Sequence, residues 1–156
     1  MEEAARPATS DDLPRLAELA RTAIAELRAT KGGEVWVRRE ARVEPVEETL
    51  AIDLANPDAV VLAGTIDDAV IGYAVAVIET LPDGDALARL TDVYVEEDAR
   101  GIGVGEMLLD AVIAWAVERK CIGIDSLALP GNRETKNFFE SFGLVARAIV
   151  VHRPLQ

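Results

Sequence analysis

One segment of the sequence passes from a β-branched strand through a short acidic loop into an apolar helix. The strand ends on Val93-Tyr94-Val95, and glycines stand at Gly101, Gly103 and Gly105 where the helix starts. Glycine lets a ligand approach the backbone without a Cβ in the way. The first N–H groups of a helix are free, and the helix dipole places partial positive charge there. The segment therefore predicts an anion site for a phosphate or pyrophosphate.

Two common phosphate-binding patterns do not fit this loop. The Walker pattern needs a lysine after its last glycine, and the dinucleotide pattern needs a third glycine at position 106, where the chain has Glu106. The spacing that fits is Arg-x-x-Gly-x-Gly, with Arg100, Gly103 and Gly105. With this loop the sequence resembles the GNAT superfamily of acyl-CoA-dependent N-acyltransferases, in which the corresponding loop holds the pyrophosphate of coenzyme A.

A second block strengthens the resemblance. Asn132 is followed by Phe138-Phe139-Glu140-Ser141-Phe142-Gly143-Leu144, which is similar to the family segment Asn…(Leu/Phe)-Tyr-Glu-x-x-Gly-Phe. The resemblance implies acetyl-CoA as cofactor and direct attack of a primary amine on its thioester. It also implies pairing between the backbone of Val93–Val95 and the pantetheine arm. The cofactor-binding residues that it implies are Val93, Tyr94, Val95, Arg100, Gly101, Ile102, Gly103, Val104, Gly105, Asn132 and Phe139. From the residues alone, Asn132 is equally well explained as a helix N-cap.

Composition limits the alternatives. The chain has 156 residues, half of them hydrophobic, so we expect a single folded domain over residues 1–156. No apolar run approaches the roughly 20 residues of a membrane span, and no signal peptide is visible at the N-terminus. A single cysteine, Cys121, excludes a disulfide framework and a thiolate-rich metal site, which favours the cytoplasm. The net charge of −12 argues against nucleic acid as a partner.

The order of elements predicts an α/β (α+β) fold of GNAT type, with a mixed, mostly antiparallel sheet of six to seven strands and about four helices. Residues 32–44 show little periodicity and are expected to form a loop. Three successive strands with short turns predict an antiparallel meander, and the strand–helix–strand segment after it predicts one parallel crossover. The expected strands are 4–9, 59–65, 69–79, 86–95, 122–129 and 144–151, and the expected helices are 10–30, 45–55, 105–120 and 133–141.

One catalytic group of the family has no counterpart in this chain. Where the family usually has a tyrosine as general acid, this chain has Phe139, which has no proton to give. Tyr94 is the candidate that replaces it, with Tyr73 and Cys121 as further options. Asp92, a carboxylate in an otherwise apolar strand, is the candidate base, because partial burial would raise its pKa. A strand-edge charge that faces water explains Asp92 equally well.

The acceptor is expected to be a small-molecule or peptide amine. Trp36, Arg38 and Arg39 lie where the family often borders the acceptor, although each is also explained by a solvated loop. No metal site is expected, and an edge strand near the C-terminus suggests a homodimer. Two other functions fit the glycine loop. One is a non-catalytic acyl-CoA-binding regulatory module, which Phe139 favours, and the other is a nucleotide-binding protein.

Overall fold

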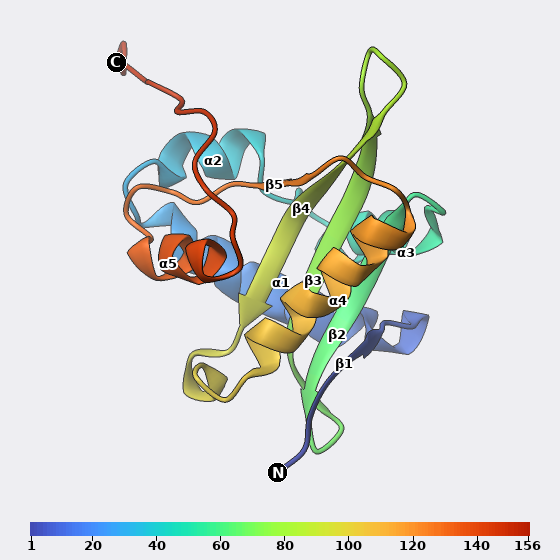
Figure 1. The fold of residues 1–156 in the computed structure, drawn as a ribbon. Coiled ribbons are helices and arrows are strands. Elements are labelled where there is room, and N and C mark those ends of the chain that lie inside the picture. Colours follow the sequence, from blue (N-terminus) through green and yellow to red (C-terminus); the bar gives the residue numbers. More distant parts are fainter.

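A sheet of five strands in the order β1-β2-β3-β4-β5 forms the centre of the computed structural model, which describes residues 1–156 (Figure 1). The strands are β1 (Glu3–Pro7), β2 (Ala59–Ile66), β3 (Ala69–Thr80), β4 (Ala86–Val95) and β5 (Ile124–Ser126). The helices are α1 (Leu13–Arg28), α2 (Gly33–Arg39), α3 (Val46–Ala55), α4 (Val104–Glu118) and α5 (Arg133–Ser141), with short 3₁₀ turns at Ser10–Asp12 and Glu97–Ala99.

The predicted meander and crossover are both confirmed. Strands β1 to β4 pair antiparallel, and β5 pairs with β4 in parallel after the crossover through α4. The turn between β2 and β3 places Asp67 and Asp68 at φ 48° and 70°, a left-handed conformation that aspartate tolerates and that tight hairpins need.

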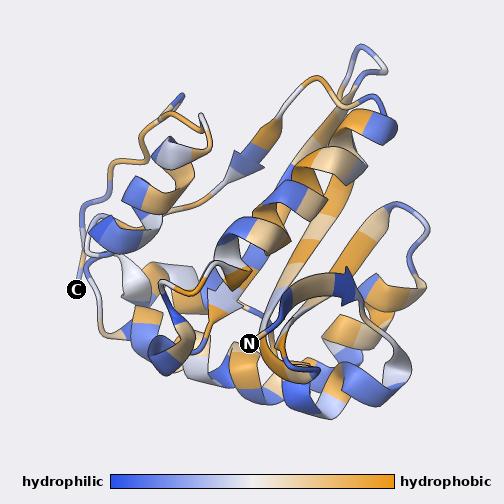
Figure 2. Ribbon diagram, turned by 60° about the horizontal axis from the view of Figure 1, so that its bottom comes forward, coloured by the Kyte–Doolittle hydropathy of each residue, from blue (hydrophilic) through white to orange (hydrophobic).

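Two apolar layers enclose the sheet. On one face, α1 and α3 bury Leu16 and Leu50 against the strands. On the other face, α4 buries Leu108 and Val112, and α5 adds Phe139. A Cβ on Gly64 would lie 2.6 Å from Val104, so the absence of a side chain in β2 lets α4 approach the sheet closely. Figure 2 shows hydrophobic residues along the central strands, hydrophilic ones at the turns, and both kinds on the helices.

The prediction for the C-terminal part of the sheet was wrong. The strand predicted at 122–129 is limited to Ile124–Ser126, and residues 144–151 form no strand, so the sheet has five strands rather than six to seven. β-branched residues favour a strand only where another strand edge pairs with them. The last segment meets β5 through one ion pair, between Arg147 and Asp125, and otherwise extends away from the body (Figure 1).

The region 32–44 also differs from expectation, because it contains α2. This helix is only seven residues long, which is too short to show a helical period in the sequence. It begins after Gly32, whose φ of 88° turns the chain sharply after α1. No helix in the structure combines the length and the apolar character that a membrane span requires.

Candidate active site

The glycine loop presents bare backbone between β4 and α4. Gly101 and Gly103 have φ values of 84° and 102°, a region that L side chains rarely adopt. No atom lies within 4 Å of the position that a Cβ would take at either residue. Gly103 is the N-cap of α4, so the open side of the loop leads directly onto the first turn of that helix.

The same loop carries a row of free hydrogen-bond donors. None of the backbone N–H groups from Gly101 to Glu106 donates to an acceptor in the protein, and the first donor of α4 with a partner is Met107, bonded to the Gly103 carbonyl at 3.1 Å. The dipole of α4 adds partial positive charge at this end. Unpaired N–H groups and an open backbone surface together form a site that suits phosphate oxygens.

Strand β4 has an open edge next to this loop. β5 pairs only with Ala88–Leu90, so the rest of β4 has no strand on that side. The Glu96 N–H donates to the Ile71 carbonyl at 2.9 Å, on the β3 side. Because bonded and non-bonded pairs alternate in antiparallel strands, the N–H and C=O groups of Val93 and Val95 point away from β3. An extended ligand chain can pair with such an edge as an added strand.

Arg100 does not extend into solvent beside the loop. Its Nε donates to the Val95 carbonyl at 2.9 Å, and its Nη2 lies 3.2 Å from an Oε of Glu26 on α1. The guanidinium also lies over the Tyr94 ring, 5.3 Å from the ring centroid, and its Nη1 is 3.9 Å from Glu134. The arginine that the sequence assigns to the phosphate is thus held by a carboxylate of the protein, that of Glu26.

The side chain of Tyr94 points to the α1 face of the sheet, opposite to the side chains of Val93 and Val95. Its hydroxyl donates to Glu26 at 2.9 Å. Burial, together with the Glu26 carboxylate, raises the pKa of Tyr94 to about 12. At neutral pH the tyrosine therefore keeps its proton and directs it at Glu26.

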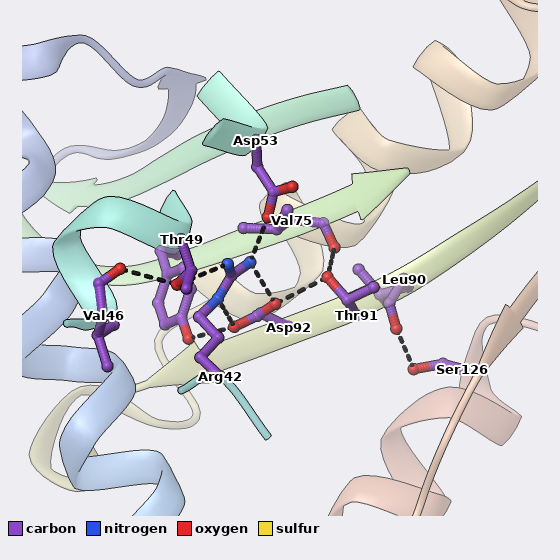
Figure 3. A network of polar contacts seen from close by, with 10 residues as sticks. Arg42, Val46, Thr49, Asp53, Val75, Leu90, Thr91, Asp92 and Ser126 are labelled. Atoms are coloured by element: carbon purple, nitrogen blue, oxygen red, sulfur yellow. Dashed lines mark hydrogen bonds and ion pairs between the residues drawn. The ribbon is translucent and has the colours of Figure 1, made fainter. Parts of the chain in front are cut away.

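Asp92 lies in a polar network between β4 and α3 (Figure 3). Arg42 donates through Nε and Nη2 to the two carboxylate oxygens, each at 2.8 Å, and its Nη2 also lies 2.8 Å from Asp53. The hydroxyls of Tyr73 and Thr91 donate to the same carboxylate, each at 2.7 Å. The side chains of Arg42 and Asp92 are only 10% and 12% exposed. Burial, with the neighbouring carboxylate, raises the pKa of Tyr73 well above its usual value.

The hydrogen bonds of this network limit how Asp92 could act as the general base. Both oxygens of Asp92 are already occupied, one by Arg42 and Tyr73 and the other by Arg42 and Thr91. A general base needs a free oxygen within reach of the proton that it removes. The role of base for Asp92 therefore stays a prediction, and the geometry favours a structural role as the partner of Arg42.

The second sequence block forms α5 and packs against the loop. Asn132 is the N-cap of α5 and accepts a hydrogen bond from the Thr135 N–H at 3.3 Å, so its side chain has the capping role, and its contact with the cofactor stays a prediction. Phe139 is 6% exposed and packs in the apolar layer of α4. The ring of Phe138 lies 3.4 Å from the position of a Cβ on Gly105.

The residues expected at the acceptor lie on α2. Trp36 is half-buried, whereas Arg38 and Arg39 are exposed, and the only ion pair of Arg39 is with its neighbour Glu40 at 3.6 Å. A Cβ on Gly32 would lie 3.4 Å from Pro130, so the start of α2 is beside the turn between β5 and α5.

Residues 18–144 match the family model of the acetyltransferase (GNAT) family. The chain belongs to the GNAT family of acetyltransferases. Enzymes of this family use acetyl-CoA, and the glycine cradle and free N–H groups of this chain suit its phosphates. The fold prediction and the cofactor prediction are thereby confirmed, apart from the number of strands.

Solved structures share the fold of this GNAT chain over nearly its whole length. The tetramutant of BH1408 protein from Bacillus halodurans is 19% identical, with a TM-score of 0.81 over 97% of this chain and 99% of that one. AAC(6')-Iy in complex with the bisubstrate analog CoA-S-monomethyl-acetylneamine is 17% identical, with a TM-score of 0.75 over 100% and 99%. A ribosomal-protein-alanine N-acetyltransferase from Brucella melitensis biovar Abortus 2308 is 17% identical, with a TM-score of 0.72 over 99% and 100%.

Glu26 is the residue of this GNAT chain that the sequence did not reveal. Its carboxylate binds both Tyr94 and Arg100, which lie 68 and 74 positions away. On its own helix Glu26 resembles any exposed acidic residue, so no local pattern distinguishes it. The sequence did not reveal the pairing of Arg42 with Asp92 for the same reason, because 50 positions separate the two residues.

Proposed function

We propose that this GNAT acetyltransferase transfers the acetyl group of acetyl-CoA to a primary amine by direct attack of the amine. When bound, acetyl-CoA supplies a thioester as the acyl donor. The observation that carries the proposal is the row of free N–H groups from Gly101 to Glu106, next to the open edge of β4. These two features suit the two parts of the cofactor that need holding, its phosphates and its extended pantetheine arm.

The roles follow from what each group offers. The loop N–H groups would bind the pyrophosphate, and the outward backbone groups of Val93 and the N–H of Val95 would pair with the pantetheine, since the Val95 carbonyl already accepts from Arg100. A direct attack needs no covalent enzyme intermediate, and Cys121 is poorly placed to form one. It follows the C-terminal end of α4, a helix of 15 residues, so it is roughly 22 Å from the glycine loop.

The acid–base chemistry relies little on dedicated side chains. Phe139 has no proton to donate, and Tyr94 directs its proton to Glu26. Asp92 is bound by Arg42. Water is therefore the proposed acceptor of the amine proton. An alkyl thiol has a pKa of only about 8.5, so loss of the thiolate needs less help from an acid than loss of an alkoxide would.

A second candidate function has a specific observation in its favour. Phe139 replaces the tyrosine that the family uses as an acid, while the glycine loop is intact. A chain that binds acyl-CoA without transferring the acyl group, as a regulatory module, would have this combination. Both functions use the same loop, so binding of the cofactor cannot separate them.

The acceptor is proposed to be a small-molecule or peptide amine. One structurally similar protein was solved with an acetylneamine bisubstrate analog, and another is named as a ribosomal-protein-alanine N-acetyltransferase. The acceptors in these two names are chemically very different. In this chain α2 lies beside the turn that precedes α5, which supports Trp36, Arg38 and Arg39 as residues that border the acceptor.

Release of free thiol from acetyl-CoA, measured with a panel of polyamines, amino acids, aminoglycosides and peptides, tests transfer. We expect at least one amine to raise the release well above the rate without amine, with a matching mass increase of one acetyl group on that amine. Tight binding of acetyl-CoA with no transfer to any amine would instead support the regulatory module. Absence of binding to any CoA species would contradict both functions.

We also propose that two copies of the chain associate through the C-terminal segment, residues 145–156. Its apolar side chains are more than three-quarters exposed, and the outer edge of β5 has no strand beside it. In a two-fold arrangement the segment of each copy would lie on the β5 edge of the other and cover both. The residues that would be covered are Val145, Ile149, Val150, Val151 and Leu155.

Light scattering coupled to gel filtration tests this association. We expect the native chain to elute with the mass of a dimer at micromolar concentration, because exposed apolar side chains are buried on pairing. The double substitution Ile149→Asp and Val151→Asp is expected to give a monomer with an unchanged far-UV circular dichroism spectrum. A native chain that stays monomeric at high concentration would contradict the proposal.

A further inference from the structure

The side chain of Arg100 already makes contacts within the protein that compete with binding to a phosphate. Of its five N–H donors, one binds the Val95 carbonyl and one lies against Glu26 at 3.2 Å. The guanidinium is held over the Tyr94 ring by the same contacts. Its side chain is 31% exposed, so the ion pair lies at the surface and solvent can reach it.

Glu26 is well placed to hold this arginine. One of its carboxylate oxygens accepts the Tyr94 hydroxyl at 2.9 Å, and the other faces Arg100. The tyrosine, which is only 8% exposed, fixes the carboxylate at the end of β4. The surroundings are acidic, since an open groove of about 250 Å³ beside Glu26 is also lined by Glu96, Glu97 and Asp98. Arg100 is the only cation that the structure places against Glu26.

We infer that Glu26 competes with the phosphates of the cofactor for Arg100, so that the resting chain keeps this guanidinium in an ion pair within the protein. The inference rests on the proposed function, because it takes the glycine loop as the pyrophosphate site. Arg100 directly precedes the loop that carries the free N–H groups. Phosphates bound there would draw the guanidinium toward the loop and away from α1. Glu26 is thus a positioning residue that acts on the cofactor through Arg100.

A Glu26 that competes for Arg100 and a Glu26 that supports Arg100 predict opposite effects on the affinity for CoA. If Glu26 merely oriented Arg100 toward the phosphates, then removing its charge would weaken the binding of CoA. If Glu26 competes, then removing its charge frees the guanidinium and strengthens the binding. A third effect, general repulsion between carboxylates and phosphates, would also strengthen binding, but it would not depend on Arg100.

Isothermal titration with CoA separates these effects in a double-mutant cycle. Glu26→Gln keeps the size of the side chain and an oxygen that can accept from Tyr94. We expect it to lower the dissociation constant of CoA about twofold to fivefold, the range of a partly exposed ion pair. In an Arg100→Ala background the same substitution is expected to change the constant by less than about twofold. Glu97→Gln is the matched control, because Glu97 lines the same groove and has no ion pair with Arg100.

Three results would overturn the inference. The first is weaker or unchanged CoA binding by Glu26→Gln, and the second is the same gain in the presence and absence of Arg100. The third is an equal gain from Glu97→Gln, which would indicate general repulsion. Failure of the native chain to bind CoA at all would remove the proposed function and this inference with it, whereas CoA binding that Glu26→Gln does not tighten would remove the inference alone. A thermal melt of each variant without ligand checks that the fold is retained.

Discussion

Gly103→Val is expected to weaken the binding of acetyl-CoA about a hundredfold. Gly103 has a φ of 102° and is the N-cap of α4, and no atom lies near the position of its missing Cβ. A valine there would push the backbone out of the left-handed region and place two methyl groups where the phosphates would bind. Loss of one or two charge-assisted hydrogen bonds from the loop corresponds to about 3 kcal/mol or more, which is a factor of about 100 or more. Titration calorimetry measures the change.

The chain offers a matched control at Gly84. This glycine lies in the turn between β3 and β4, has a φ of 92° and also has nothing near its Cβ position. Gly84→Val therefore introduces the same kind of backbone strain, about 1 to 2 kcal/mol, far from the loop. We expect it to lower the unfolding midpoint and to leave the dissociation constant unchanged. Equal loss of affinity in the two variants would contradict the assignment of the loop as the cofactor site.

Arg42→Met is expected to lower the free energy of unfolding by about 3 kcal/mol, the size of effect seen when one partner of a buried ion pair is removed. The substitution leaves the carboxylates of Asp92 and Asp53 without their cation in a place where Asp92 is only 12% exposed. For a chain of this length, such a loss lowers the unfolding midpoint by about 6 to 12 °C. Thermal unfolding followed by circular dichroism measures it.

Arg21→Met is the control for this prediction. Arg21 also binds two carboxylates, those of Glu44 and Glu47, but more than 40% of the surface of each of the three side chains is exposed to solvent. Solvent screens such pairs, so the unfolding midpoint is expected to change little. A stable Arg42→Met variant with normal cofactor binding and strongly reduced transfer would contradict the structural role of Asp92 and favour its role as a base.

The sequence predicted those parts of the site that depend on neighbouring residues. The glycines at 101, 103 and 105 follow a strand and open a helix, and a backbone site of this kind is contained in one short segment. The meander and the parallel crossover could be predicted for a similar reason, since short turns and one intervening helix fix how neighbouring strands pair.

What the sequence could not predict depends on contacts between distant segments. The β-branched run at 144–151 looks like a strand, but whether it pairs depends on an edge elsewhere in the structure. The role of Asp92 depends on Arg42, and that of Arg100 on Glu26, across 50 and 74 positions. A carboxylate in an apolar strand has the same sequence pattern whether it is a base or the partner of an arginine.

Hydrogen exchange, followed by mass spectrometry with and without acetyl-CoA, reports directly on the glycine loop, because the proposed ligands are themselves backbone N–H groups. We predict that acetyl-CoA slows exchange in peptides that cover residues 91–106, where the open edge of β4 meets the glycine loop, and leaves the β2–β3 turn unchanged. Protection confined to other parts of the chain, with residues 101–106 exchanging as fast as without ligand, would mean that the glycine loop is not the cofactor site.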